Sequence, residues 1–278
     1  MLKTIKTGKL GRVVLRLVEK GGELHGVAEE DGKRVVHIVG EPDETGDHVW
    51  MKLQGEVAKK SANYFGYDGA RARFLKYFPG GFASDAYVGE GGQHGTGERA
   101  YKLRAKALLE DLAPLEAAAT GSGYGAAVRR AFQATNLLSP FEKPRIGDVL
   151  SGPNADDFVR GAARFALGDI GAGLTEMEKA SKADGAAKWT VATYLPFLWR
   201  PDVHVFLKPE VTKDYAVRVG HQFGDVYGPA LRQEVYESLR DLYAKTNDAI
   251  TDLGPRDNID LQSFIWVVGE YMDEEPNA

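Results

Sequence analysis

The fold is decided first by the stretch VVLRLVEKGGELHGVAEEDGKRVVHIV, which occupies residues 13–39. Two turn signals, Gly21-Gly22 and Asp31-Gly32, divide it into three runs rich in branched apolar residues. Asp-Gly between such runs indicates a hairpin, because both residues accept the positive φ that a tight turn requires. The stretch therefore predicts an antiparallel β-meander. Residues 48–53, after the turn at 40–46, are predicted to form a fourth strand.

Beyond Gly55 the apolar residues recur with a helical period. Leu231, Val235, Leu239 and Leu242 show it most clearly and predict a helix over residues 229–252. A buried closing helix is expected over 260–269, capped by Asp260. We therefore expect an α+β fold, with a small N-terminal antiparallel β-meander (1–55) followed by a mainly α-helical body (56–278). Three prolines and two glycines suggest an internal boundary near 139–154.

The composition is that of an ordinary globular protein. The chain has 278 residues, of which 43% are hydrophobic and 27% charged, so it can bury a large core without disulfides or structural metal ions. It contains no cysteine, which excludes disulfides, thiol nucleophiles and cysteine-held zinc or iron–sulfur sites. The six histidines show no metal-ligand spacing, and we expect neither a metal nor another cofactor.

The first residues lack the apolar stretch of a secretory signal, and no run approaches the roughly 20 apolar residues that cross a bilayer. We therefore expect a cytoplasmic protein that does not associate with a membrane.

Positive charge is concentrated in the middle of an acidic chain. The net charge is −5, but residues 52–106 contain ten Lys and Arg against five Asp and Glu. Aromatic residues interleave with these cations, a combination that can clamp phosphates and stack on bases. An amphipathic helix with an aromatic core would give the same pattern and stays open as an alternative. The candidate nucleic-acid-binding residues are Lys59, Lys60, Arg71, Arg73, Lys76, Arg99, Lys102 and Arg104.

A glycine-rich segment at residues 89–97 precedes a predicted helix that carries Arg99 and Lys102. Backbone N–H groups and two cations at such a place can hold a phosphate. The segment lacks the Lys-Ser/Thr ending of a P-loop, so an ordinary surface loop is the competing interpretation.

Asp202, His204 and Lys208 are the candidate catalytic residues. They lie in a short segment, 200–209, that is predicted to be extended and has a proline near each end. An acid, an imidazole and an amine close together suit acid–base chemistry or a metal-dependent nuclease or phosphohydrolase. The spacing lacks the Asp/Glu-x-Lys pair of such nucleases, and a structural edge strand is the alternative.

Three parts of the chain resemble segments of uncharacterised bacterial proteins of unassigned activity. They are residues 74–82 with 98–102, residues 194–198 through 206–209, and residues 260–267. The last of these resembles closing segments of some restriction-associated or anti-phage proteins. The resemblance implies a role in nucleic-acid biology and assigns no catalytic residue.

The sequence thus favours a non-enzymatic protein that binds DNA or another anionic partner through its basic, aromatic-rich middle segment. A metal-dependent nuclease or phosphohydrolase is one alternative. A structural subunit of a homo-oligomer is the other.

Overall fold

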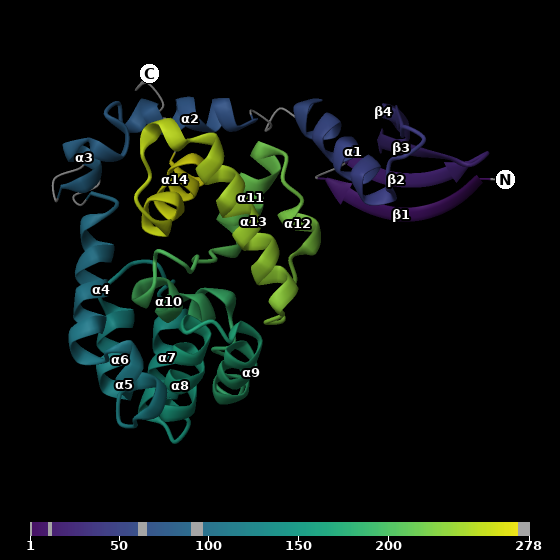
Figure 1. Cartoon of the computed structure of the whole chain (residues 1–278). Helices are drawn as coiled ribbons and strands as arrows, with labels where there is room; N and C mark the ends of the chain where they lie inside the picture. The colour runs from purple at the N-terminus through teal and green to yellow at the C-terminus, as the bar shows by residue number, and fades with distance from the viewer. Residues whose placement is uncertain (1, 11–12, 61–65, 90–96, 272–278) are drawn as a thin grey trace. The chain divides into compact units, whose positions relative to one another are not determined.

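The computed structural model describes residues 2–10, 13–60, 66–89 and 97–271 (Figure 1). The chain forms two compact units. Unit 1 comprises Met1–Arg71 and Lys213–Tyr227, and unit 2 comprises Ala72–Thr212 and Gly228–Ala278. A four-stranded antiparallel sheet is followed by helices, so the predicted α+β class is confirmed. The boundary near 139–154 stays a prediction, although helix α7 (Glu142–Ser151) occupies most of that range.

The sheet of unit 1 is a meander in which each strand pairs with the next. Its strands are β1 (Leu2–Leu10), β2 (Val13–Lys20), β3 (Glu23–Glu30) and β4 (Lys33–Val39), in the order β1-β2-β3-β4. Asp31 and Gly32 have φ values of 49° and 75°, as the Asp-Gly signal predicts for a two-residue hairpin. β1 was not predicted, because an irregularity in its pairing between Thr4 and Lys6 breaks the alternation of side chains.

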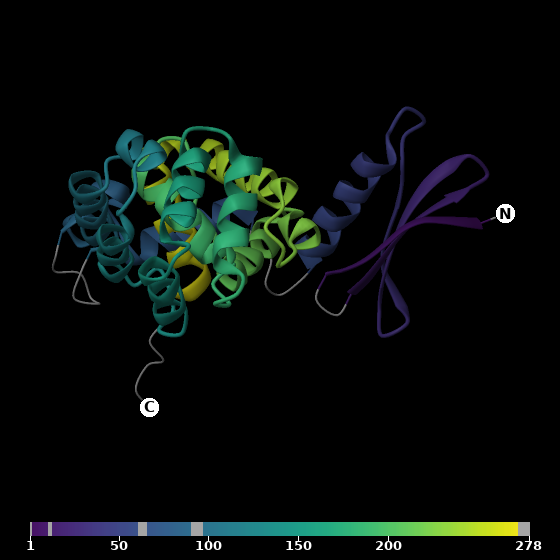
Figure 2. The same ribbon diagram turned by 90° about the horizontal axis from the view of Figure 1, so that it is seen from below.

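Helix α1 (Gly46–Lys60) covers one face of this sheet, along one side of the strands in Figure 2. The predicted strand at 48–53 is therefore wrong. Val49, Leu53 and Val57 are spaced four residues apart, which places them on one side of a helix, and they pack with Leu15 and Leu17 of β2. The hydroxyl of Thr45 accepts a hydrogen bond from the His48 N–H at 3.3 Å and helps to begin the helix.

Unit 2 is helical, and two of its helices, α2 and α11, belong to it only in part. The helices that lie wholly or partly in unit 2 are α2 (Gly66–Tyr77), η1 (Gly81–Ala83), α3 (Asp85–Val88), α4 (Ala100–Leu112), α5 (Leu115–Thr120), α6 (Gly125–Gln133), α7, α8 (Ala155–Ala166), α9 (Ile170–Ser181), α10 (Trp189–Trp199), α11 (Pro209–Val219), α13 (Gln233–Ala249), η2 (Thr251–Leu253) and α14 (Asn258–Glu270). Unit 1 adds α12 (Phe223–Val226), whose Asp225 accepts a hydrogen bond from Gln54 of α1. Within the described ranges, no helix has the length and apolar character needed to cross a membrane.

The core of unit 2 forms around α10, in which every residue is buried. This helix packs against α4, α8 and α9. Its uniform burial explains why residues 189–199 are apolar without a helical stripe, since a helix surrounded on all sides has no polar face.

Two local predictions about unit 2 need correction. Residues 200–208 form an irregular connection and not a strand, and Pro209 begins α11. Asp257, not Asp260, caps α14, because its side chain accepts hydrogen bonds from the N–H groups of Ile259 and Asp260.

Candidate functional site

The predicted catalytic candidates have separate partners in the structure. Arg200 donates from Nε and Nη2 to the two carboxylate oxygens of Asp202, at 3.2 and 3.1 Å. The ammonium of Lys208 lies 4.2 Å from the centre of the Trp266 ring. Across the described part of the chain, no hydrogen bond or ion pair joins any two of Asp202, His204 and Lys208. The three side chains are therefore not linked to one another by hydrogen bonds.

His204 is buried, and its two ring nitrogens are both engaged. Nδ1 lies 3.1 Å from the Tyr236 hydroxyl, and Nε2 lies 3.0 Å from the carbonyl oxygen of Ala166. The Tyr236 hydroxyl also accepts the Val205 N–H at 3.1 Å, so its own proton is available to Nδ1. This pattern assigns a neutral ring with the proton on Nε2. Burial accordingly lowers the pKa of His204.

A protein site for a metal ion requires several ligand side chains that lie close together. Among residues 2–10, 13–60, 66–89 and 97–271, no three His, Asp or Glu side chains are grouped so that they could hold a metal ion.

Arg99, predicted to bind nucleic acid, is directed into unit 2. Its guanidinium donates to both carboxylate oxygens of Asp257, at 2.8 and 2.7 Å, and to Oδ1 of Asp260 at 2.7 Å. Asp260 also accepts from the Tyr87 hydroxyl at 2.6 Å and from Nε of Arg256 at 2.9 Å. These donors lower the pKa of Asp260 against the opposing effect of burial. Arg99 is therefore a structural ion-pair residue and not part of an exposed basic surface.

Lys102 is fully buried on α4. Its ammonium donates to the Ser263 hydroxyl at 2.7 Å and to Glu98 at 3.4 Å. Burial lowers the pKa of Lys102 to about 8, while Glu98 opposes that shift. Glu98 in turn accepts from the Tyr271 hydroxyl at 2.8 Å. Neither Arg99 nor Lys102 is thus available to a phosphate at the glycine-rich segment, of which residues 90–96 lie outside the described residues.

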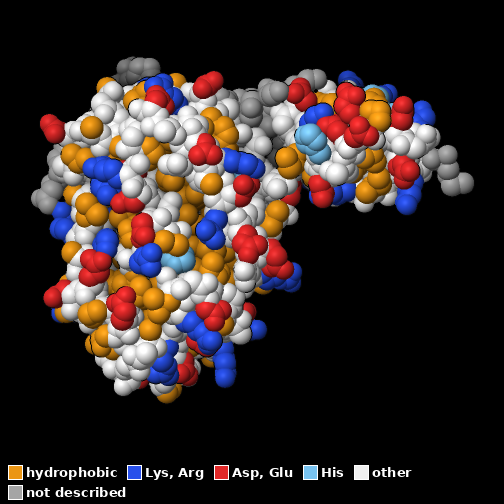
Figure 3. Space-filling view, in the orientation of Figure 1, with side chains coloured by type: hydrophobic (Ala, Val, Ile, Leu, Met, Phe, Trp, Pro, Cys, Tyr) orange, Lys and Arg blue, Asp and Glu red, His pale blue; other side chains and the backbone are white. Residues whose placement is uncertain are grey.

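The other predicted cations are distributed differently. Arg73 donates to the backbone carbonyls of Val268 and Tyr271 at the end of α14. Arg71 and Lys76 also lie on α2, and Arg104 lies on α4. The side chains of Lys59 and Lys60 are outside the described residues. Figure 3 shows Lys and Arg interspersed with Asp and Glu on the visible face of unit 2.

A different cationic surface lies on the edge strand β1. Its sequence, LKTIKTGKL, contains Lys3, Lys6, Lys9 and two threonines but no carboxylate, and those lysines and threonines are exposed. We call Lys3, Thr4, Lys6, Thr7 and Lys9 the β1 edge. Lys6 faces Asp47 at 3.6 Å in an exposed ion pair. Counting charges over residues 2–20 would have identified this surface from the sequence, because they contain six Lys and Arg and one Glu.

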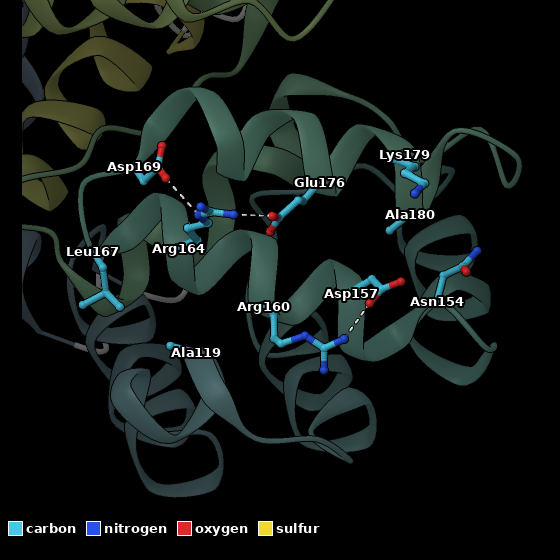
Figure 4. A pocket seen from close by; sticks show the side chains of 10 residues that line it. All are labelled: Ala119, Asn154, Asp157, Arg160, Arg164, Leu167, Asp169, Glu176, Lys179 and Ala180. Atoms are coloured by element: carbon cyan, nitrogen blue, oxygen red, sulfur yellow. Dashed lines mark hydrogen bonds and ion pairs between the residues drawn. The ribbon is translucent and has the colours of Figure 1, made fainter.

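A groove of unit 2 lies between α8 and α9, beside α5, and has a volume of about 630 Å³ (Figure 4). Arg164 bridges Asp169 at 2.9 Å and Glu176 at 2.5 Å across the groove. Arg160 pairs with Asp157 at 2.5 Å. Because these exposed carboxylates neutralise both guanidinium groups, the groove has little net attraction for an anion.

Comparison with protein-family models, with characterised proteins and with solved structures finds no match to this chain. The fold and the surfaces define a helical α+β protein with a basic sheet edge. Its function is therefore argued from its own residues.

Proposed function

We propose that the protein binds nucleic acid without catalysing a reaction, and that the β1 edge contacts the phosphate backbone. The observation that carries the proposal is an exposed edge strand with three lysines, two threonines and no carboxylate, in a chain of net charge −5. The proposal keeps the predicted activity but moves its site from the middle segment, where Arg99 and Lys102 are buried.

The spacing on β1 suits an elongated polyanion. Lys3, Lys6 and Lys9 are three residues apart, which corresponds to steps of about 10 Å along a strand. Phosphates follow one another by about 3.4 Å along the axis of each DNA strand, so the row spans several of them. Lys3 and Lys6 pair with Glu19 and Leu17 and project from the face of the sheet that α1 covers, whereas Lys9 pairs with Val14 and projects from the other face. The side chains therefore lie along both sides of the edge and do not converge on a pocket-sized ligand.

The backbone of an edge strand adds further donors. Alternate N–H groups of an edge strand point away from the sheet and have no partner in it. Together with the hydroxyls of Thr4 and Thr7, they supply neutral hydrogen bonds to phosphate oxygens beside the lysine charges. Arg16 and Lys20 of the neighbouring strand β2 are also exposed, although Arg16 pairs with Glu29 at 3.1 Å.

Lysines on an edge strand also prevent it from pairing with a strand of another protein. A peptide that added to β1 would bind through backbone hydrogen bonds and apolar side chains such as Leu2 and Ile5. Such binding would depend weakly on salt. Phosphate binding releases counterions and falls steeply as salt rises, which separates the two modes.

The test is fluorescence anisotropy of labelled duplex and single-stranded oligonucleotides over a range of salt concentrations. In the triple variant K3Q/K6Q/K9Q we expect weaker binding to every sequence. The slope of log K against log salt should fall by about one unit for each lysine that contacts a phosphate. The matched control K179Q/K182Q/K188Q removes the same charge from exposed positions of unit 2 and should bind like the wild type.

A second triple variant, R71Q/K76Q/R104Q, tests the middle segment. If it abolishes binding while K3Q/K6Q/K9Q retains it, the β1 edge is not the site. Absence of binding at low salt, or binding that does not respond to salt, contradicts the proposed function as a whole.

A further inference from the structure

A second cavity of unit 2 is lined by a guanidinium, that of Arg240, which has no ion-pair partner among the described residues. The cavity has a volume of about 370 Å³ and lies between the 200–205 connection, α13, and residues 255–261 around the start of α14. We call it the Arg240 pocket. Its polar lining consists of Asp202, Arg240, Asn247, Arg256, Asp257 and Asn258. The volume is at the lower end of the range of small-molecule sites, about 300–1,000 Å³.

Three carboxylates lie in the lining of the pocket or directly behind it, and each of them is already paired with an arginine. Asp202 is held by both hydrogen bonds from Arg200, and Asp257 by both from Arg99. Asp260 lies behind the wall and accepts from Arg99 and Arg256. None of these carboxylates is paired with Arg240.

Arg240 makes no hydrogen bond or ion pair with any residue that the structure describes. The lining of the pocket itself carries two guanidinium groups, on Arg240 and Arg256, and two carboxylates, on Asp202 and Asp257. Burial, and then the charge of Arg240, lower the pKa of the nearby His204, so its neutral ring adds no positive charge. Arg240 is thus the one charged side chain of the lining that has no ion-pair partner among the described residues.

The neutral groups of the lining suit the same ligand. The side-chain amides of Asn247 and Asn258 line the pocket and have no hydrogen-bond partner in the described part of the chain. Each presents two N–H donors. The wall opposite is rigid, because Asp257 both caps α14 and holds Arg99. Together with Arg240, these amides offer several hydrogen-bond donors to one compact oxyanion.

From these observations we infer that the Arg240 pocket binds the oxyanion of a small molecule, either a phosphate or a carboxylate group. Both groups match the planar fork of an arginine side chain, which donates two parallel hydrogen bonds to them. The α8–α9 groove is larger but does not meet this condition, since carboxylates in the groove itself neutralise Arg160 and Arg164. The inference is independent of nucleic-acid binding by the β1 edge.

The experiment is a titration of the full chain with inorganic phosphate and, separately, with succinate, followed by calorimetry and by the melting temperature. Sodium chloride of equal ionic strength is the reference. We expect one of the two oxyanions to bind and to raise the melting temperature above that reference. Stronger binding of phosphate indicates a phosphate ligand, and stronger binding of succinate indicates a carboxylate ligand.

The decisive variant is Arg240→Gln. Loss of one charge-assisted contact should weaken binding by about tenfold or more. Arg240→Lys keeps the positive charge but lacks the planar fork of two donors, so its affinity should lie between those of R240Q and the wild type. Arg232→Gln is the matched control, because Arg232 is an exposed arginine at the N-cap of α13 and does not line the pocket.

Three results would overturn the inference. They are equal affinity in R240Q and the wild type, equal loss in R232Q, and no binding of either oxyanion beyond the chloride reference. Since R240Q leaves β1 intact, its affinity for oligonucleotides should not change, and the two proposals can fail separately.

Discussion

Arg99 and Asp257 are 158 positions apart in the chain and form a two-bonded ion pair, with Nη1–Oδ1 and Nη2–Oδ2 distances of 2.8 and 2.7 Å. The same carboxylate caps α14 by accepting the N–H groups of Ile259 and Asp260. One aspartate thus ties the start of α4 to the start of α14. The pair is nearly buried, with 9% of the Arg99 side chain and 16% of the Asp257 side chain exposed.

Replacing Arg99 with methionine should lower the free energy of unfolding by about 3–5 kcal/mol, because it leaves the largely buried Asp257 without its cation and Asp260 with Arg256 alone. Urea unfolding measures the change, and Arg99→Lys should cost less. Arg232→Gln, at an exposed site, should stay within about 0.5 kcal/mol of the wild type. An R99M protein as stable as the wild type would show that the Arg99–Asp257 pair contributes nothing to the free energy of unfolding.

Lys102 predicts a rise of stability with pH. Its pKa is about 8 in the folded protein and 10.5 as the reference value, so between these values the unfolded chain binds more protons. The free energy of unfolding should therefore increase from pH 7.5 to 9.5, by at most about 1.4 kcal/mol per pH unit. Denaturant unfolding across this range should show a smaller slope in Lys102→Met. Equal slopes in both proteins would contradict the lowered pKa.

His204 predicts a loss of stability on acidification. Because its pKa is lower in the folded than in the unfolded chain, its contribution is fully present above about pH 6.5 and is lost as the pH falls through the folded pKa. Protonation of Nδ1 would also displace the hydrogen bond from Tyr236. Between pH 7.5 and 5.5, the melting temperature should depend less on pH in His204→Gln than in the wild type.

Tyr236→Phe provides the companion measurement at neutral pH. It leaves Nδ1 of His204 and the Val205 N–H without their partner, at a cost of about 1–3 kcal/mol. A neutral effect of this change would show that the buried groups find other partners.

Gly173 on α9 and Gly161 on α8 permit a close approach of the two helices. A Cβ at Gly173 would lie 2.6 Å from the Gly161 carbonyl oxygen and 2.7 Å from the Phe165 backbone. Gly173→Ala should therefore destabilise unit 2 by about 1–3 kcal/mol or more, because neither helix backbone can yield locally.

Gly55, inside α1, is the opposite case and the control. A Cβ there meets no atom within 4 Å, so Gly55→Ala should stabilise by about 0.5–1 kcal/mol through the lower entropy of the unfolded chain. Circular dichroism melts of both alanine variants measure the contrast. Similar effects at the two positions would contradict the packing argument.

Where a local pattern is sufficient, the sequence predicts the structure. The Asp31-Gly32 turn follows from the backbone that those two residues accept, and α13 follows from the spacing of Val235, Leu239 and Leu242. Pro114 likewise separates α4 from α5, since proline cannot continue a helix. The same reasoning failed at residues 48–53, where a short apolar run fits a strand or a helix equally well.

The positions of the charged residues were determined only by the tertiary structure. Arg99 and Arg104 are both arginines of one basic segment, yet Arg99 is buried because Asp257 and Asp260, far along the chain, come to lie beside it. Arg240 shows the reverse, as it lines a cavity that three separate segments create. Charge and periodicity are properties of neighbouring residues, whereas burial and pairing depend on which distant segments meet. The sequence by itself therefore determined those elements that have a distinct local pattern, and the tertiary structure determined which side chains are available to a ligand.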